Sequence, residues 1–112
     1  MIERYQEMLP ALRAVARTHG YALGFHGSGE RDLDLIAVPW ADGASSADVL
    51  VEALRVAIHG HIAQVGADGA FLGREPIVKP HGRLAWAIRP LDNNPDAALY
   101  VDLSVMPRGP TE

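Results

Sequence analysis

The sequence predicts an α+β protein with one domain covering residues 1–112, in which two main helices accompany a mixed, mainly antiparallel sheet of about five strands. Three observations support this prediction. The chain has 112 residues, which is enough for one hydrophobic core but not for two. Hydrophobic residues make up 48% of the chain and charged residues 21%, as in ordinary folded proteins. Helical and extended patterns follow one another in the order helix, two strands, helix, three strands.

The first helix is expected within residues 2–19, where apolar side chains recur every three or four positions. Pro10 lies inside this segment, so the helix either bends there or begins near that residue. Gly20 is well placed to end it, because glycine readily adopts the left-handed conformation found after helix C-termini.

The second helix is expected to begin after residues 41–46, since Ser45 and Asp48 resemble a capping box with a shorter acid. Gly66 marks the latest position at which this helix can end, and His59 and His61 would then lie at its solvated end. The residues expected on its apolar face are Leu50, Leu54, Ala57, Ile58 and Ile62.

The predicted strands are rich in β-branched and other apolar residues and are bounded by turn-forming residues. These segments are residues 21–26, 32–40, 71–78, 83–91 and 98–106. Pro80-His81-Gly82 and residues 92–96 supply the turns between the last three. Trp86 alternates with apolar neighbours and is expected in the core, whereas Trp40 at a strand end is ambiguous.

Charge and composition narrow the classes of function. The chain has 14 acidic and 10 basic residues, a formal net charge of −4 and no basic stripe, so nucleic acid is not expected as its main partner. It has no cysteine, which excludes disulfides and thiolate metal sites. No uncharged apolar run is long enough to span a bilayer, so no membrane partner is expected and a cytoplasmic location is the default. An exposed strand edge in so small a domain leaves pairing into a homodimer open.

Three aspartates interrupt otherwise apolar strands. Asp32 and Asp34 are two residues apart, so both point to the same face, and Asp102 in YVDLSV stands opposite the apolar side of its own strand. Like charges side by side on a sheet repel each other, and a divalent cation between them would relieve that repulsion. We therefore predict a metal site if the two strands are neighbours. The alternative is that each aspartate is solvated at a turn or an edge strand.

Two turns carry residues suited to binding phosphate. Gly27, Ser28 and Gly29 end the first strand with flexible backbone and a hydroxyl, and Arg31 follows them. His26 precedes this turn as a candidate accessory residue. The alternative is that Arg31 is a solvated turn residue and that His26 only flanks the turn.

The second turn has the sequence KPHGR, in which Lys79, His81 and Arg83 could hold a phosphate if the turn lies over the aspartates. The alternative is a polar hairpin turn without a ligand.

Together these motifs resemble the nucleotidyltransferase fold of the polymerase-beta superfamily. The matching residues are Gly27-Ser28, then Asp32 and Asp34 in RDLDLIAV, then Asp102 in YVDLSV. More loosely, HGS, RDLDLIAVPW, KPHGR and YVDLSVMP are similar to small phage and prophage proteins. The second resemblance spans most of the chain and implies a fold more than an activity.

The superfamily resemblance implies that Asp32, Asp34 and Asp102 bind Mg²⁺ or Mn²⁺, with Asp102 as a ligand or general base. The Gly-Ser turn would contact a nucleoside triphosphate, from which a nucleotidyl group passes to an unknown acceptor. Superfamily members usually have a short helix between Gly-Ser and the first aspartate, whereas here only residues 29–31 intervene. Two other functions fit the same residues: a non-catalytic phage factor that binds a nucleotide or a protein, and a metal-dependent phosphohydrolase or nuclease.

Overall fold

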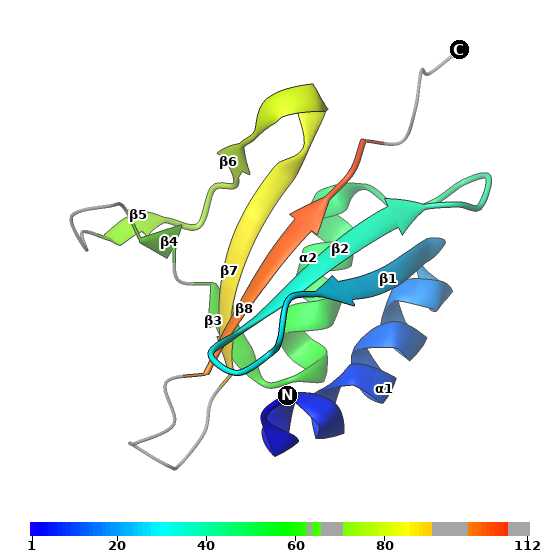
Figure 1. The fold of residues 1–112 in the computed structure, drawn as a ribbon. Coiled ribbons are helices and arrows are strands. Elements are labelled where there is room, and N and C mark those ends of the chain that lie inside the picture. Colours follow the sequence, from blue (N-terminus) through cyan, green and yellow to red (C-terminus); the bar gives the residue numbers. More distant parts are fainter. Residues whose placement is uncertain (63, 66–70, 91–98, 108–112) are drawn as a thin grey trace.

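The computed structural model describes residues 1–62, 64–65, 71–90 and 99–107, and Figure 1 shows their arrangement. The helices are α1 (Glu3–Thr18), α2 (Ala47–Ala57) and a short 3₁₀ turn, η1 (Pro80–Gly82). The strands are β1 (Tyr21–His26), β2 (Asp32–Pro39), β3 (Gly60–Ile62), β4 (Gln64–Val65), β5 (Phe71–Gly73), β6 (Ile77–Val78), β7 (Leu84–Pro90) and β8 (Tyr100–Val105). The predicted α+β class is confirmed.

The main sheet has six strands in the described part of the chain, with the order β1-β2-β8-β7-β3 and with β6 paired to β7. β2 and β8 are parallel, and the other pairs are antiparallel. β4 and β5 form a separate antiparallel pair. This order brings the last strand next to the strand that carries the first two aspartates.

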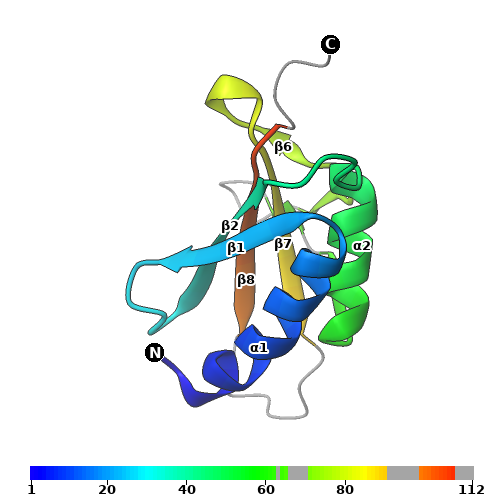
Figure 2. The ribbon, with the colours of Figure 1, turned by 90° about the vertical axis from the view of Figure 1, so that its right-hand side faces the viewer.

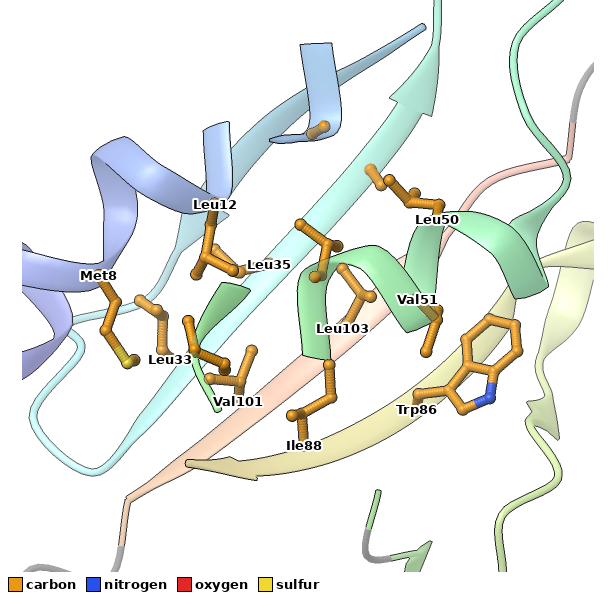
Figure 3. Close-up of a cluster of buried hydrophobic side chains, with 14 of the residues drawn as sticks. Met8, Leu12, Leu33, Leu35, Leu50, Val51, Trp86, Ile88, Val101 and Leu103 are labelled. Atoms are coloured by element: carbon orange, nitrogen blue, oxygen red, sulfur yellow. The ribbon is translucent and has the colours of Figure 1, made fainter. Parts of the chain in front are cut away.

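Both helices cover the same face of the sheet (Figures 1 and 2), and among the described residues no helix covers the opposite face, which we call the open face. Alternate residues of β2 and β8 are buried beneath the helices, among them Leu33, Leu35, Val101 and Leu103. Figure 3 shows these side chains packed against residues from α1, α2 and β7. Trp86 lies in this core, as predicted, whereas Trp40 is exposed just beyond β2. Side-chain alternation therefore assigns the remaining residues of β2 and β8 to the open face.

The first helix agrees closely with its prediction. α1 continues through Pro10 without a break, so the proline neither starts nor divides it. Gly20 follows the C-cap residue with φ of +85°. A Cβ at Gly20 would lie 2.9 Å from the Cα of Ala44, so both the backbone conformation and the space favour glycine.

The start and end of the second helix differ from the prediction. Ser46, not Ser45, is the N-cap, and its hydroxyl accepts a hydrogen bond from the Val49 N–H. The predicted Ser45–Asp48 capping box is therefore wrong. The Ser45 hydroxyl instead bonds to His19 Nδ1 at 2.9 Å, which ties the loop to the end of α1.

The expectation that the second helix extends toward Ile62 is also wrong. α2 ends at Ala57, and His59 adopts a φ of +51° in the turn that follows. Gly60–Ile62 then forms β3 along β7. A Cβ at Gly60 would lie 2.8 Å from Ile88 Cγ2, so a glycine lets this strand approach the sheet closely. Leu50, Leu54 and Ile58 are buried, as predicted for the apolar face.

The predicted strand at residues 71–78 is two short strands, β5 and β6, separated by residues 74–76. Pro76 has no backbone N–H to donate to a sheet, which explains why one continuous strand does not form. The predicted turn at residues 92–96 and the limit at Gly66 lie outside the described residues. None of the described helices has the length and apolar character needed to cross a membrane.

Candidate functional site

The predicted aspartates come together through the parallel pairing of β2 with β8. In this register Asp34 is the direct partner of Asp102, and Asp32 is the partner of Tyr100. All three aspartates are partly buried and alternate with fully buried neighbours, which places them on the open face. Paired strands lie about 4.8 Å apart, so Asp34 and Asp102 are adjacent. We call Asp32, Asp34 and Asp102 the acidic patch.

The row that contains Asp34 and Asp102 crosses four strands. His26 at the end of β1 is the register partner of Asp34, and Ala87 of β7 is the partner of Asp102. Directly opposed residues point to the same side of a sheet, so His26 lies beside the acidic patch on the open face. The structure thus places the predicted accessory histidine next to the acids.

The three carboxylates of the acidic patch act on one another electrostatically. Burial raises the pKa of the Asp102 carboxyl, and the nearby charge of Asp34 and then of Asp32 raises it further. Lys79 and Arg83 act in the opposite direction and lower this pKa. The carboxyl of Asp102 therefore holds its proton to a higher pH than an ordinary aspartate does.

The two cations that act on Asp102 belong to the predicted KPHGR turn. The backbone N–H of Lys79 donates to the Arg83 carbonyl at 2.8 Å, which closes the turn around η1. His81 has a φ of +67° within it and is exposed. Lys79 and Arg83 therefore lie near enough to the acidic patch for their charges to act on Asp102. No contact of His81 with that patch is seen among the described residues.

The turn between β1 and β2 has no helix. Gly27 has a φ of +79°, and a Cβ built on it would lie 3.5 Å from Asp34 Oδ2. The turn backbone is thus next to the acidic patch. The Ser28 hydroxyl accepts a hydrogen bond from the Glu30 N–H at 3.2 Å and keeps its own proton to donate. Gly29 also has a positive φ, of +68°, and Arg31 is exposed.

Tyr5 of α1 is a site residue that sequence reasoning missed. Its side chain is fully buried, and its hydroxyl donates to the Arg31 carbonyl and accepts from the Tyr100 N–H at 3.0 Å. Burial raises the pKa of this hydroxyl, with smaller contributions in the same direction from Asp32 and Asp34. Tyr5 therefore joins the residue before β2 to the first residue of β8. The three-four spacing of apolar residues within residues 2–19 indicates that Tyr5 is buried, but it cannot reveal the hydrogen bonds of its hydroxyl.

Arg89 and Tyr100 form a second missed pair on the open face. The Arg89 guanidinium carbon lies 5.3 Å from the centre of the Tyr100 ring, within cation–π distance. Burial and the charges of Asp102 and Asp32 raise the pKa of Tyr100, and Arg89 lowers it. Trp86 and Ile88 of β7 point into the core. Because side chains alternate along a strand, Arg89 points to the open face.

The donor set of the acidic patch suits a hard divalent cation. Three carboxylates offer oxygen ligands. Burial first, and then the charges of Asp34 and Asp32, raise the pKa of Asp102, and a cation would relieve the part that comes from like charges. Within the described ranges, no group of three or more His, Cys, Asp or Glu side chains has the geometry to hold a metal ion. Binding would therefore require the carboxylates to rotate toward one another about their side-chain torsions.

Comparisons with protein-family models, with curated proteins and with solved structures found no match.

Proposed function

We propose that this chain is a metal-dependent nucleotidyltransferase that transfers a nucleotidyl group from a nucleoside triphosphate to an acceptor. The observation that supports this proposal is the register of β2 and β8, which sets Asp34 beside Asp102 with Asp32 on the same open face. Together with the Gly27-Ser28 turn, this arrangement follows the motif order of the superfamily that the sequence resembles.

In this proposal Asp32, Asp34 and Asp102 hold Mg²⁺ or Mn²⁺ through their carboxylate oxygens. When bound, the metal would supply charge stabilisation for the attacking and leaving oxygens of the transfer. The environment of Asp102, whose carboxyl pKa is raised, suits a group that takes the proton from the attacking hydroxyl. His26, beside Asp34, is the neighbouring group that could then pass a proton to solvent.

The chain's cations would hold the triphosphate. Lys79 and Arg83 project from a closed turn and already act on Asp102, so phosphates near the metal would lie within their electrostatic reach. The Ser28 hydroxyl and the backbone of Gly27 and Gly29 would contact phosphate from the other side. Arg31 and His81 are exposed and would assist only if they turn inward.

A second candidate is a non-catalytic nucleotide-binding or protein-binding factor on the same fold. The specific observation in its favour is the direct turn from β1 to β2, which has no helix N-terminus to bind phosphate. A metal-dependent phosphohydrolase or nuclease would use the same three acids with water as the nucleophile.

The test is calorimetric titration of Mg²⁺ and Mn²⁺ with and without nucleoside triphosphates, together with an assay for released pyrophosphate. The variant is Asp34→Asn, and the matched control is Asp42→Asn, an exposed residue in the loop before α2. We expect metal binding and pyrophosphate release by the native chain and by the control but not by Asp34→Asn.

Three other outcomes would redirect the proposal. Nucleotide binding without pyrophosphate release would favour the binding factor, and phosphodiester cleavage would favour the nuclease. If neither metal nor nucleotide binds, the enzyme proposal is wrong.

A further inference from the structure

β1 forms one edge of the main sheet, and among the described residues it pairs with β2 alone. Along a strand of an antiparallel pair, residues direct their backbone groups alternately toward the neighbouring strand and away from it. The Trp40 N–H donates to the Gly20 carbonyl, so the even-numbered residues of β1 direct their backbone groups toward β2. The backbone groups of Leu23 and Phe25 then point outward. This edge can therefore accept one more strand.

α1 lies beside β1 on the helical side, the face of the sheet that the helices cover (Figure 2). Arg13 Nε donates to the outward-facing Leu23 carbonyl at 3.4 Å, so the guanidinium of Arg13 lies at the edge. Arg17, one helical turn later, lines a hollow of about 310 Å³ together with Arg13 and the first residues of β1. Trp40 lines the same hollow and is 65% exposed. Two cations and an aromatic ring thus flank the edge of β1.

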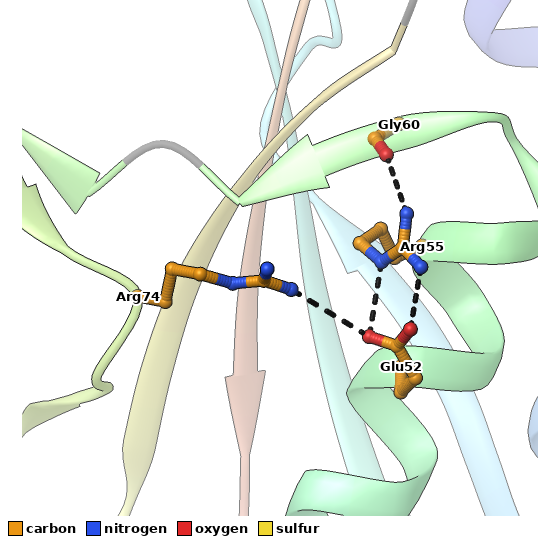
Figure 4. Close-up of polar contacts among 4 residues, drawn as sticks. All are labelled: Glu52, Arg55, Gly60 and Arg74. Atoms are coloured by element: carbon orange, nitrogen blue, oxygen red, sulfur yellow. Dashed lines mark hydrogen bonds and ion pairs between the residues drawn. The ribbon is translucent and has the colours of Figure 1, made fainter.

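These two arginines lack the acidic partners that other arginines of the protein have. Figure 4 shows Arg55 and Arg74 paired with the Glu52 carboxylate. In the ranges that the structure describes, no carboxylate forms an ion pair with either arginine at the β1 edge. The sequence explains this difference, since residues 8–29 contain no acidic residue although the whole chain has a net charge of −4. The edge of β1 is a basic surface on an acidic protein.

The side chains of an added strand would alternate between the helical side and the open face. Leu23 pairs with the buried Ala37, so it belongs to the helical side, and Phe25 two residues later shares that side. Directly opposed residues point to the same side of a sheet. Every second residue of an added strand would therefore point toward the side of α1. Phe25 is 43% exposed and offers apolar surface to the residue opposite it.

The spacing of Arg13 and Arg17 matches the spacing of these alternate residues. Four residues of a helix span about 6 Å, and two residues of a strand span about 6.7 Å. Arg13 lies at Leu23, and Arg17 lines the hollow beside Tyr21. An added strand with acidic residues opposite Leu23 and Tyr21 would bring each carboxylate to one guanidinium, and such pairs form strong hydrogen bonds.

A second copy of β1 fits this edge less well than an acidic strand does. Twofold antiparallel pairing of β1 with itself would bring Arg13 and Arg17 of one copy toward the same residues of the other. Four guanidiniums without acidic partners would repel one another, and charged side chains at a sheet edge commonly prevent self-pairing in this way. The arginines therefore oppose self-association here and favour an acidic partner.

We propose that the β1 edge binds an extended acidic peptide segment of a partner protein, which adds to the sheet as an antiparallel strand. Main-chain hydrogen bonds supply affinity in this mode of recognition, and alternate side chains supply specificity. From its N-terminus the segment has an apolar residue opposite Phe25, an acidic residue opposite Leu23 and another opposite Tyr21, with one residue between each. The acidic patch takes no part in this binding, so the proposal does not depend on the nucleotidyltransferase proposal.

The test is fluorescence polarisation of labelled synthetic peptides titrated with the whole chain. The probe is Thr-Phe-Thr-Glu-Thr-Glu-Thr, which has the proposed pattern. The matched peptide Thr-Phe-Thr-Glu-Glu-Thr-Thr has the same composition, but its acidic residues are adjacent, so only one of them can face α1. We expect the probe to bind saturably and the matched peptide to bind about tenfold or more weakly, since one charged hydrogen bond is lost.

N-methylation of the probe tests whether the peptide adds as a strand. The first glutamate of the probe lies opposite Leu23, and its N–H would donate to the Leu23 carbonyl. Methylation of this nitrogen should abolish binding. Methylation of the threonine that follows should leave binding nearly unchanged, because its N–H points away from β1.

Charge reversal tests the two arginines. Arg13→Glu and Arg17→Glu should each weaken binding of the probe by about tenfold or more. The double variant should instead bind a probe with lysines in place of its glutamates, which shows that it remains folded and that the pairing is specific. Arg74→Glu reverses an exposed charge elsewhere on the protein and is the matched control, which should bind the original probe as the native chain does.

Four outcomes would overturn the proposal. The first is no binding of the probe, and the second is equal binding of the probe and the peptide of the same composition. The third is an equal effect of N-methylation at the two positions, which would show that no strand is added. The fourth concerns a second copy as the occupant: a native dimer in sedimentation velocity that the probe converts to monomers would assign the edge to another copy of this chain.

Discussion

Asp34 and Asp102 are direct partners in the parallel pairing of β2 and β8, so two carboxylates lie side by side on one face of the sheet. Opposed like charges destabilise a sheet. Burial raises the pKa of the Asp102 carboxyl most, and the charge of Asp34 raises it further. On the far side of Asp102 the register partner is Ala87, whose small side chain brings no counter-charge. The arrangement works against folding stability, and a bound cation would reverse that effect.

The first prediction concerns the pH dependence of stability. Because the pKa of Asp102 is raised above its ordinary value of 3.8 in the folded protein, folding opposes its ionisation. This cost is absent below pH 3.8, grows as the pH rises through the folded pKa, and is complete above it. Asp102→Asn removes the cost, so we expect this variant to unfold at a higher temperature than the native chain at pH 7. The two should be equal near pH 3.

Thermal unfolding across this pH range, without divalent ions, checks the prediction, with Asp42→Asn as the control. Adding Mg²⁺ should then stabilise the native chain more than Asp102→Asn, since a ligand that binds only the folded state raises its stability. A stability difference that does not depend on pH would contradict the electrostatic explanation.

The second prediction concerns the core. Leu103 is fully buried in the core between the sheet and the helices. Its neighbour Asp102 on β8 belongs to the acidic patch on the other face. Leu103→Ala should lower the free energy of unfolding by about 2–5 kcal/mol, through lost burial and the cavity that remains. Val38→Ala, at an exposed position on β2, should change it by less than about 0.5 kcal/mol. Urea denaturation of both variants measures the difference.

The fold was largely predictable because its strands follow simple alternation. The prediction for β1 matches the structure, and β2 differs by one residue at its end. The error at β3 has a physical cause: Ile58 and Ile62 continue a helical spacing, and local periodicity cannot show that Gly60 packs against Ile88. Whether such a segment forms a helix or a strand depends on tertiary packing between residues that are far apart in the sequence.

The site was only partly predictable for the same reason. Alternation within β2 indicates that Asp32 and Asp34 point away from the core, and alternation within β8 indicates the same for Asp102. It does not indicate that the two strands are neighbours. That adjacency depends on the order of the whole sheet. In the sequence Tyr5 looks like one more apolar residue of a helix, because a hydroxyl that bonds to two distant backbone groups leaves no local pattern.

The third prediction separates phosphate binding from metal binding. Lys79→Gln combined with Arg83→Gln should weaken nucleoside triphosphate binding by about tenfold or more, since hydrogen bonds from charged groups contribute about 1.5–3 kcal/mol each. Binding of Mg²⁺ alone should stay equal or become tighter, because these cations oppose the charge of Asp102. Titration calorimetry with each ligand measures both. The control is Arg17→Gln, which removes an exposed cation on α1. If the control loses as much nucleoside triphosphate affinity, the effect comes from net charge and not from the turn that carries Lys79 and Arg83.

The fourth prediction compares two tyrosines whose hydroxyls both bond to backbone groups. Tyr5→Phe leaves the Arg31 carbonyl and the Tyr100 N–H without their partner at the start of β2 and β8. Tyr21→Phe removes a 2.7 Å hydrogen bond to the Ser45 carbonyl, at the other end of β2. Each should lower the free energy of unfolding by about 1–3 kcal/mol.

Only Tyr5→Phe should also weaken Mg²⁺ binding, because the strand ends that it releases carry Asp32 and adjoin Asp34 and Asp102. Chemical denaturation and metal titration of both variants make the comparison, with Tyr21→Phe controlling for lost stability. If the two variants lose metal affinity equally, Tyr5 supports the fold in general and does not position the acidic patch.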